Sequence, residues 1–441
     1  MSTITRPRPY QNYVYGYPHK TAYRPLGADS PLLSELWASE PKDALSLYAH
    51  IPFCEYRCGF CNLFTRVGAP DDLTGRYLDA LERQAGAVRA ALGDDGPVRF
   101  AAAAFGGGTP TYLSAAELAR LCDIAERVMG ADLRSIPLSV ETSPATATAD
   151  RLAVLAERGA TRVSIGVQSF VDAEARAAVR PQRRAEVEAA LETIRAARIP
   201  ILNIDLIYGI DGQTEQTWRT SLDAALTWQP EELYLYPLYV RPLTGLSRRD
   251  AEADWDGQRL RLYAFGRDHL LAHGYEQTSM RMFRRIGSAS AGPGDYACQT
   301  DGMIGLGCGA RSYTAGLHYS FDYAVETREV RGIIDTYTRT VDFSHAEVGR
   351  RIDEDEARRR HLLQSLLQAE GMDIAAYRTR FGAHPAEHFA TELREFTESG
   401  WLDAGSDLLR LTPEGLAYSD ALGPRLFSPA VHAAMAAYEP K

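Results

Sequence analysis

Short apolar runs alternate with longer amphipathic stretches between about residue 45 and residue 240. The apolar runs lie at 45–51, 98–105, 137–141, 162–167, 201–207 and 233–239. Near-continuous apolar runs are typical of strands in a parallel sheet whose outer face is covered by helices. The alternation therefore predicts six strand–helix units and an α/β fold.

Two of the amphipathic stretches have a clear helical period. Apolar residues recur at three- and four-residue intervals from Tyr77 to Val88 and again from Leu118 to Val128, as in helices that bury one face. Six units, instead of the eight of a closed barrel, predict a partial (β/α)6 barrel that stays open on one side. Its functional residues are expected at the carboxyl ends of the strands.

The two flanks of this region have different patterns. Residues 1–44 are rich in proline, tyrosine and glycine without a period; they predict an irregular lead-in that packs on the barrel, since so aromatic a segment is untypical of a disordered tail. A helical run at 355–368 and a strand-like pair near 401–411 predict a small, mainly helical, winged-helix-like C-terminal domain. The expected divisions are 1–44, 45–349 for the barrel with its closing extension, and 350–441.

Composition narrows the class of protein. The chain has 441 residues, 45% of them hydrophobic, which is enough for a large core and a satellite domain. A net charge of −10 argues against a nucleic-acid partner. The chain contains no apolar run of about 18 residues, which a membrane span would need, and its first residues show no apolar signal-peptide core. We expect a cytoplasmic location with no membrane partner.

Half of the six cysteines are concentrated in one place. A C-x3-C-x2-C pattern directly after the first predicted strand is formed by Cys54, Cys58 and Cys61. The others are scattered, at Cys122, Cys298 and Cys308, so they predict no disulfide framework. Three thiolates on one loop can bind three irons of a 4Fe–4S cluster and leave the fourth iron open. A zinc site would need a further cysteine or histidine pair, and none follows at the usual spacing.

This pattern resembles the radical S-adenosylmethionine (SAM) enzymes of the HemN-like branch, typified by oxygen-independent coproporphyrinogen III oxidase. The resemblance extends from about Tyr48 through the C-terminal domain. It implies that Cys54, Cys58 and Cys61 bind a 4Fe–4S cluster, whose free iron is chelated by the amino and carboxylate groups of SAM. The cluster and SAM are therefore the expected cofactors.

Several strand ends match positions that contact SAM in this family. After the second strand, the run Gly106-Gly107-Gly108-Thr109 lets a ligand approach the backbone closely, and the carboxylate of Glu141 at the third strand end suits a ribose or an ammonium group. The resemblance implies cofactor contacts for Tyr48, Phe60, Gly107, Gly108, Thr109, Glu141, Gln168, Arg180, Asp205, Tyr239 and Arg311. Taken singly, these residues equally suit tight turns, strand ends or core packing.

Two departures separate the chain from well-known members of the branch. The porphyrinogen oxidases carry a fourth cysteine two residues after the third, where this chain has Leu63. Haem chaperones carry a His-Asn-x-x-Tyr-Trp segment after the barrel, which residues 274–282 lack. A third subgroup, the HemN-like methyltransferases and cyclopropanases of natural-product pathways, has a lead-in similar to residues 17–23 and is thought to bind two SAM molecules.

The resemblance to this subgroup implies a radical reaction. One electron from the cluster cleaves the first SAM to methionine and a 5′-deoxyadenosyl radical, which takes a hydrogen atom from the methyl group of the second SAM. The resulting methylene radical adds to an unsaturated carbon of the substrate and leaves a methyl group or a cyclopropane. Tyr275, Glu276 and Arg281 are candidates for the base or hydrogen donor that this step needs.

Two other functions stay open at this stage: oxidative decarboxylation of a porphyrinogen propionate, and haem delivery without catalysis. For either enzymatic function we expect a small-molecule substrate and an electron donor such as flavodoxin or ferredoxin.

Overall fold

The central sheet of the computed structural model confirms the predicted α/β architecture. The structure describes residues 8–439 and 441, except 12, 15, 95, 247–254 and 289–301. Within them, thirteen strands form one sheet in the order β1-β15-β14-β13-β12-β2-β5-β6-β7-β8-β9-β11-β10. Its parallel centre consists of β12 (Met303–Leu306), β2 (Leu45–Ile51), β5 (Phe100–Gly107), β6 (Leu138–Thr142), β7 (Arg162–Gln168), β8 (Ile201–Tyr208) and β9 (Glu232–Pro237).

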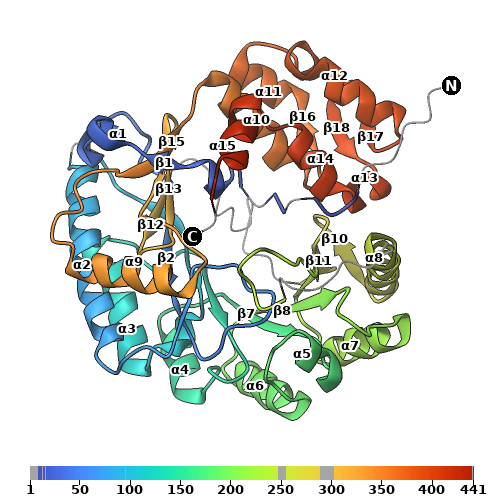
Figure 1. Cartoon of the computed structure of the whole chain (residues 1–441), viewed down its shortest axis with the longest axis horizontal. Coiled ribbons are helices and arrows are strands. Elements are labelled where there is room, and N and C mark those ends of the chain that lie inside the picture. Colours follow the sequence, from blue (N-terminus) through green and yellow to red (C-terminus); the bar gives the residue numbers. More distant parts are fainter. Residues whose placement is uncertain are drawn as a thin grey trace.

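Helices cover the outer face of this sheet, as Figure 1 shows. They are α2 (Leu73–Leu92), α3 (Ala115–Asp123), α4 (Ala149–Glu157), α5 (Asp172–Ala177), α6 (Arg184–Ala196), α7 (Glu215–Thr227) and α8 (Trp255–Ala272). The predicted apolar stripes are buried: Tyr77, Leu81 and Val88 on α2, and Leu118 and Leu121 on α3. Ser114 and Glu117 form a capping box that starts α3.

Antiparallel strands extend the sheet on both sides, and the sequence patterns did not predict them. One flank contains β13 (Arg311–Tyr313), β14 (Leu317–Ser320), β15 (Val348–Arg351) and β1 (Arg24–Pro25), and the other contains β11 (Met282–Arg285) and β10 (Tyr275–Gln277). In the described part of the chain, the edge strands β1 and β10 do not pair with each other. The barrel therefore stays open, as its six units predicted.

The C-terminal segments lie across the open side of the barrel in Figure 1. They comprise α10 (Glu354–Leu366), β16 (Met372–Asp373), α11 (Ile374–Phe381), α12 (Pro385–Glu398), β17 (Leu402–Ala404), β18 (Leu408–Leu411), α13 (Pro413–Ala417), α14 (Ser419–Arg425) and α15 (Pro429–Ala436). The predicted strand pair is confirmed as the antiparallel pair β17–β18, to which β16 adds a third strand. Helices and a small sheet together agree with the predicted mainly helical domain.

The lead-in contacts both the barrel and the C-terminal segments. It contains β1, α1 (Leu33–Trp37) and a 3-10 turn at Lys20–Ala22. The Tyr17 hydroxyl donates to Glu356 on α10, and the backbone N–H of Ser428 donates to the Tyr17 oxygen over 3.1 Å. The ring of Tyr13 meets that of Tyr236 on β9 edge-on, with centroids 6.2 Å apart. The lead-in thus bridges two parts of the fold that are far apart in sequence, while the exact domain divisions stay a prediction.

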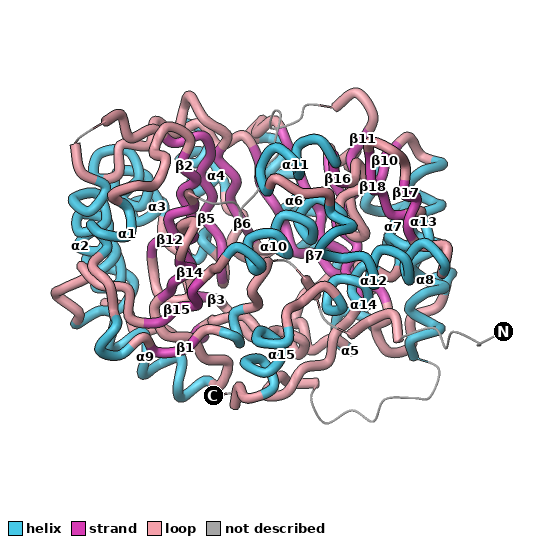
Figure 2. Tube along the Cα trace, turned by 90° about the horizontal axis from the view of Figure 1, so that it is seen from above, coloured by secondary structure: helices cyan, strands magenta, loops and turns pink. Residues whose placement is uncertain are grey.

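The carboxyl ends of the neighbouring parallel strands β2 and β5 lie side by side. Figure 2 shows β2, β5 and β6 side by side with the helices outside them, and their register aligns Ile51 of β2 with Gly107 of β5. The predicted cysteine loop and glycine run therefore leave the sheet at neighbouring points. Among the described helices, none has the length and apolar composition that a membrane crossing requires.

Candidate functional site

The three clustered cysteines lie on the loop that follows β2. Cys54 ends the two-residue strand β3 (Phe53–Cys54), which pairs with β4 (Arg66–Val67), and the backbone N–H of Arg66 donates to the Pro52 oxygen over 2.6 Å. Cys54, Cys58 and Cys61 are all free thiols of intermediate exposure. Burial raises the pKa of the Cys54 thiol to about 12. A metal that binds this sulfur must therefore displace its proton.

The donor set suits an iron–sulfur cluster better than a single ion. In the part of the chain that the structure describes, no three His, Cys, Asp or Glu side chains are arranged to hold one metal ion. A cubane takes one thiolate on each of three irons, so its ligands stand further apart than those of a single zinc ion. Three thiols on one loop fit this requirement.

The glycine run packs directly on the cysteine loop. The backbone N–H of Gly108 donates to the Ile51 oxygen and that of Thr109 to the Phe53 oxygen, both over 2.8 Å. A Cβ atom on Gly108 would lie 2.7 Å from the Phe53 oxygen and 2.9 Å from the Cys54 sulfur. The Thr109 hydroxyl lies 3.6 Å from the same sulfur. Only glycine fits at position 108 without a shift of the loop.

Two carboxylates lie on β6 and β8, the strands on either side of β7. Glu141 on β6 accepts the backbone N–H of Gly107 over 3.0 Å, and Asp205 on β8 accepts the Asn203 amide over 2.7 Å. Desolvation is the main cause that raises their pKa values, to about 7 for Glu141 and about 6 for Asp205. The charge of Asp205 adds to the shift of Glu141, whose side chain is still exposed. A cationic ligand would relieve this repulsion.

Arg180 connects the fourth strand to the cysteine loop. It is only 6% exposed, and its Nη1 atom donates to the Cys58 sulfur over 3.0 Å. Its Nη2 atom donates to the Gly166 oxygen at the end of β7. Gln168, also buried, adopts a positive φ of 70°. The structure therefore brings together residues from the cysteine loop, the glycine run, β6, β7 and β8.

Comparisons with known proteins agree with this arrangement. The model of the radical SAM superfamily matches residues 48–225, and that of the HemN C-terminal domain matches residues 352–418. The chain belongs to the HemN-like branch of the radical SAM superfamily. It is a radical SAM enzyme, and its cofactors are a 4Fe–4S cluster and SAM.

Relatives of this HemN-like protein cover most of its length. The haem chaperone HemW of Bacillus subtilis is 26% identical over 84% of this chain and 96% of its own. The oxygen-independent coproporphyrinogen III oxidase of Salmonella typhimurium is 28% identical over 92% of this chain and 91% of its own. The solved structure of the Escherichia coli coproporphyrinogen III oxidase superposes with a TM-score of 0.79 at 23% identity, covering 94% of this chain and 96% of that one. That superposition shows a shared fold.

Four further predicted cofactor contacts of the HemN-like protein are Tyr48, Phe60, Arg311 and Tyr239. The Tyr48 hydroxyl lies 3.3 Å from Nδ1 of His50, and Phe60 packs on a small apolar cluster that includes Ala178. Arg311 begins β13, and its charge helps to lower the pKa of His50. The Tyr239 hydroxyl, by contrast, donates to Asp420 of the C-terminal segments. The SAM contacts of these residues stay a prediction.

The three candidate proton or hydrogen donors lie apart from the cysteine loop in sequence and in the sheet order. Tyr275 is buried on the edge strand β10, and its hydroxyl donates to the Pro230 oxygen over 2.6 Å. Glu276 is exposed opposite Arg284. Arg281 is buried and ion-paired with Asp420. The structure thus gives Tyr275 and Arg281 partners within the protein, and their catalytic role stays untested.

Sequence reasoning missed His50, a buried histidine at the end of β2. Its Nε2 atom lies 3.0 Å from the Phe64 carbonyl oxygen, so Nε2 carries the proton and donates. Burial is the main cause that lowers its pKa to about 4, which keeps the ring neutral at pH 7. A Cβ atom on Gly107 or Gly309 would lie 2.6 or 2.7 Å from this ring. A polar residue inside an apolar strand was the signal that could have found it.

Proposed function

We propose that this HemN-like enzyme transfers a methyl or methylene group from a second SAM to an unsaturated carbon of a small-molecule substrate. Leu63, in place of the fourth cysteine of the porphyrinogen oxidases, is the observation that carries this proposal. Its side chain is 47% exposed beside the cysteine loop. Leucine has neither a metal ligand nor a proton to offer there. The chain therefore lacks a group that the oxidases place next to their cluster.

The paired carboxylates support the binding of a cationic cofactor. SAM carries a sulfonium and an ammonium charge, and the pKa values of Glu141 and Asp205 are raised, mainly by desolvation and further by a neighbouring carboxylate. A bound cation would favour their ionised forms. We assign the first SAM to this pair together with the glycine run, Gln168 and Arg180.

A reduced cluster supplies the electron that cleaves SAM when both cofactors are bound, and the protein orients the reactants. Because Gly107 and Gly108 have no side chains, their backbone packs closely against the His50 ring and the Cys54 sulfur. The neutral ring of His50 holds the adjoining Phe64 carbonyl. These groups orient the cofactor and take no proton from it at neutral pH.

The second SAM is assigned to the side of the barrel near the lead-in. The charges of Lys20 and Arg311 both act on His50, so these two cations lie near the end of β2. Cationic side chains attract the carboxylate of an amino-acid moiety. We therefore place the second cofactor between the lead-in and β13, where Arg311 begins.

Oxidative decarboxylation of a porphyrinogen is the second candidate. The 28% identity with a coproporphyrinogen III oxidase over 91% of that protein favours it. The two reactions differ in their products. Methyl or methylene transfer yields S-adenosylhomocysteine together with 5′-deoxyadenosine, whereas decarboxylation yields carbon dioxide without S-adenosylhomocysteine.

An anaerobic assay of the reconstituted enzyme with SAM and a chemical reductant distinguishes them. Coproporphyrinogen III is one substrate, and a panel of unsaturated heterocyclic compounds supplies the others. We expect S-adenosylhomocysteine and 5′-deoxyadenosine to form together with an accepted heterocycle, and no carbon dioxide from coproporphyrinogen III. Carbon dioxide in step with 5′-deoxyadenosine would contradict the proposal. A Leu63→Cys variant is the matched comparison, because it places the thiol of the oxidases at this single position.

A further inference from the structure

We propose that Arg180 raises the reduction potential of the cluster through its hydrogen bond to the sulfur of Cys58. This role is separate from the SAM contact that the family resemblance implies. It rests on the assignment of Cys58 as a cluster ligand and is independent of which group the enzyme transfers. Arg180 is here a positioning residue that acts through the cysteine.

The guanidinium of Arg180 is held at three points. Nη1 donates to the Cys58 sulfur over 3.0 Å, Nε donates to Oε1 of Gln182 over 2.5 Å, and Nη2 donates to the Gly166 oxygen. Gln182 is itself fixed, since its amide donates to the Val167 oxygen over 2.5 Å. Because every anchor belongs to the end of β7 or the segment after α5, the group cannot withdraw from the sulfur without breaking several bonds.

The backbone that carries Arg180 is strained in order to reach the loop. Val179 has a φ of +53°, a region that β-branched residues rarely adopt. Its side chain is 50% exposed, so burial of Val179 does not explain the conformation. The backbone N–H of Gly59 donates to the Ala178 oxygen over 3.0 Å, and a Cβ atom on Gly59 would lie 2.8 Å from Val179. The strained turn therefore docks on the cysteine loop and delivers Arg180 to Cys58.

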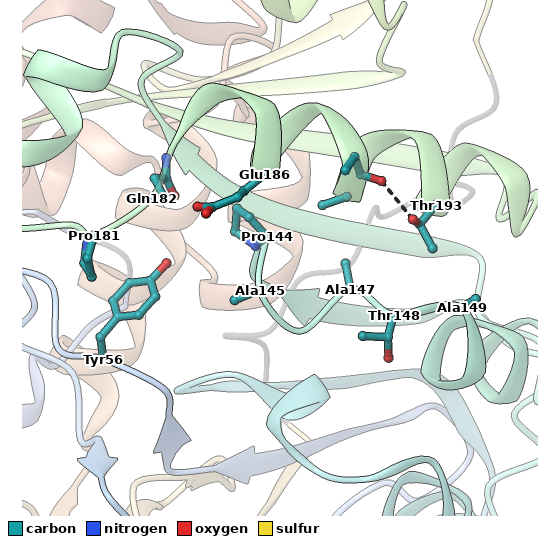
Figure 3. A pocket seen from close by; sticks show the side chains of 12 residues that line it. Tyr56, Pro144, Ala145, Ala147, Thr148, Ala149, Pro181, Gln182, Glu186 and Thr193 are labelled. Atoms are coloured by element: carbon teal, nitrogen blue, oxygen red, sulfur yellow. Dashed lines mark hydrogen bonds between the residues drawn. The ribbon is translucent and has the colours of Figure 1, made fainter.

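An aromatic ring covers the guanidinium from the same loop. The centre of the Arg180 guanidinium lies 5.4 Å from the ring centroid of Tyr56, which stands between Cys54 and Cys58. Tyr56 also lines an open hollow of about 590 Å³ together with Pro181 and Gln182, as Figure 3 shows. Since Arg180 itself is almost fully buried, water screens its charge little.

The positive charge of Arg180 affects the reduction potential because reduction changes the charge of the cluster. One electron passes from an external reductant to the cluster, so the cluster gains one negative charge and no bond forms or breaks. A hydrogen bond from a cation stabilises the more negative state, and hydrogen bonds to cluster sulfurs are one means by which proteins set the potential. Loss of the guanidinium should lower the equilibrium constant for reduction about tenfold, which corresponds to ~59 mV for one electron.

An anaerobic redox titration of the reconstituted enzyme without SAM tests this proposal, with the reduced cluster followed by electron paramagnetic resonance. We expect the equilibrium constant for cluster reduction to be about tenfold lower in Arg180→Gln than in the parent. In Arg180→Lys the loss should be smaller, and in Arg195→Gln the constant should equal that of the parent. Arg195 is the matched control because it binds Glu231 and backbone oxygens at the far end of α6. A parental potential in Arg180→Gln with full iron content would overturn the proposal.

A second variant covers the case in which Arg180→Gln assembles no cluster. Arg180→Lys keeps a positive charge but lacks the fork that binds sulfur, Gln182 and Gly166 together, so its constant should fall about threefold. A parental potential in Arg180→Lys would then overturn the proposal. Because SAM and substrate are absent, a failure of the methyl-transfer assay leaves this titration unaffected, and the two proposals can fail separately.

Discussion

A single methyl group on Gly108 should disconnect the glycine run from the cysteine loop. In Gly108→Ala the new Cβ would lie 2.7 Å from the Phe53 oxygen, 3.0 Å from the Ile51 oxygen and 2.9 Å from the Cys54 sulfur. Two of these atoms belong to the backbone, so the loop itself must move. The movement weakens the two hydrogen bonds of 2.8 Å that Gly108 and Thr109 donate to this loop.

These contacts give the expected loss of stability in Gly108→Ala. Each backbone hydrogen bond contributes about 0.5–1.5 kcal/mol net, and overpacking costs about 1–3 kcal/mol. Movement of the loop relieves part of the overpacking and keeps part of the hydrogen bonding. We therefore expect the free energy of unfolding to fall by about 2 kcal/mol. The displaced Cys54 should also reduce the iron content and the visible absorbance of the reconstituted enzyme.

Gly86→Ala is the matched control for this substitution. Gly86 lies within α2, is exposed, and has no atom within 4 Å of an added Cβ. Alanine favours a helix interior over glycine by about 0.8–1.0 kcal/mol, so this variant should be slightly more stable and bind iron fully. Denaturant unfolding and iron analysis of both variants check the argument. Parental stability and iron content in Gly108→Ala would refute it.

Three other substitutions test separate parts of the account. Glu141→Gln should weaken SAM binding, as measured by calorimetry. In the parent, the affinity for SAM should rise between pH 5.5 and pH 8. Glu141 and Asp205 ionise near pH 7 and pH 6, and their ionised forms attract the cationic cofactor. Cys58→Ala should abolish the chromophore and SAM cleavage, whereas the buried control Cys122→Ala should keep both. Asp420→Asn leaves its buried arginine partner without a carboxylate, and should lower the free energy of unfolding by about 3 kcal/mol in denaturant titrations.

Each of these three predictions has an outcome that would contradict it. A SAM affinity independent of pH in the parent would remove the two carboxylates from the cofactor site. A brown, active Cys58→Ala enzyme would exclude Cys58 as a ligand. Unchanged stability in Asp420→Asn would show that the C-terminal segments are held on the barrel by other contacts.

The central strands could be predicted because their apolar runs are local and contiguous. The expected bounds 201–207 agree with β8 (Ile201–Tyr208) within one residue. The short strand β12 was missed, since Met303–Leu306 has only four residues, one of them Gly305, and no period. Its place beside β2 depends on a pairing across more than 250 residues that no local pattern reveals.

The candidate site likewise has parts that local sequence motifs predict and parts that depend on contacts between distant residues. The cysteine loop and the glycine run are contiguous motifs, and the register of β2 and β5 places them together. The hydrogen bond from Arg180 to Cys58 joins residues 122 positions apart. It depends on the backbone of Val179, and a valine in a short loop gives no sign of a positive φ. Asp420 likewise meets Tyr239 and Arg281 only after the C-terminal segments fold over the barrel.

The transfer of deuterium from SAM labelled in its methyl group tests the central proposal most directly. The reconstituted enzyme, the labelled SAM, a reductant and the substrate panel are incubated without oxygen, and 5′-deoxyadenosine is analysed by mass spectrometry. Abstraction of hydrogen from the methyl group of a second SAM predicts one deuterium in the 5′-deoxyadenosine that forms with an accepted substrate. Unlabelled 5′-deoxyadenosine throughout, despite full SAM cleavage, would contradict the two-cofactor mechanism.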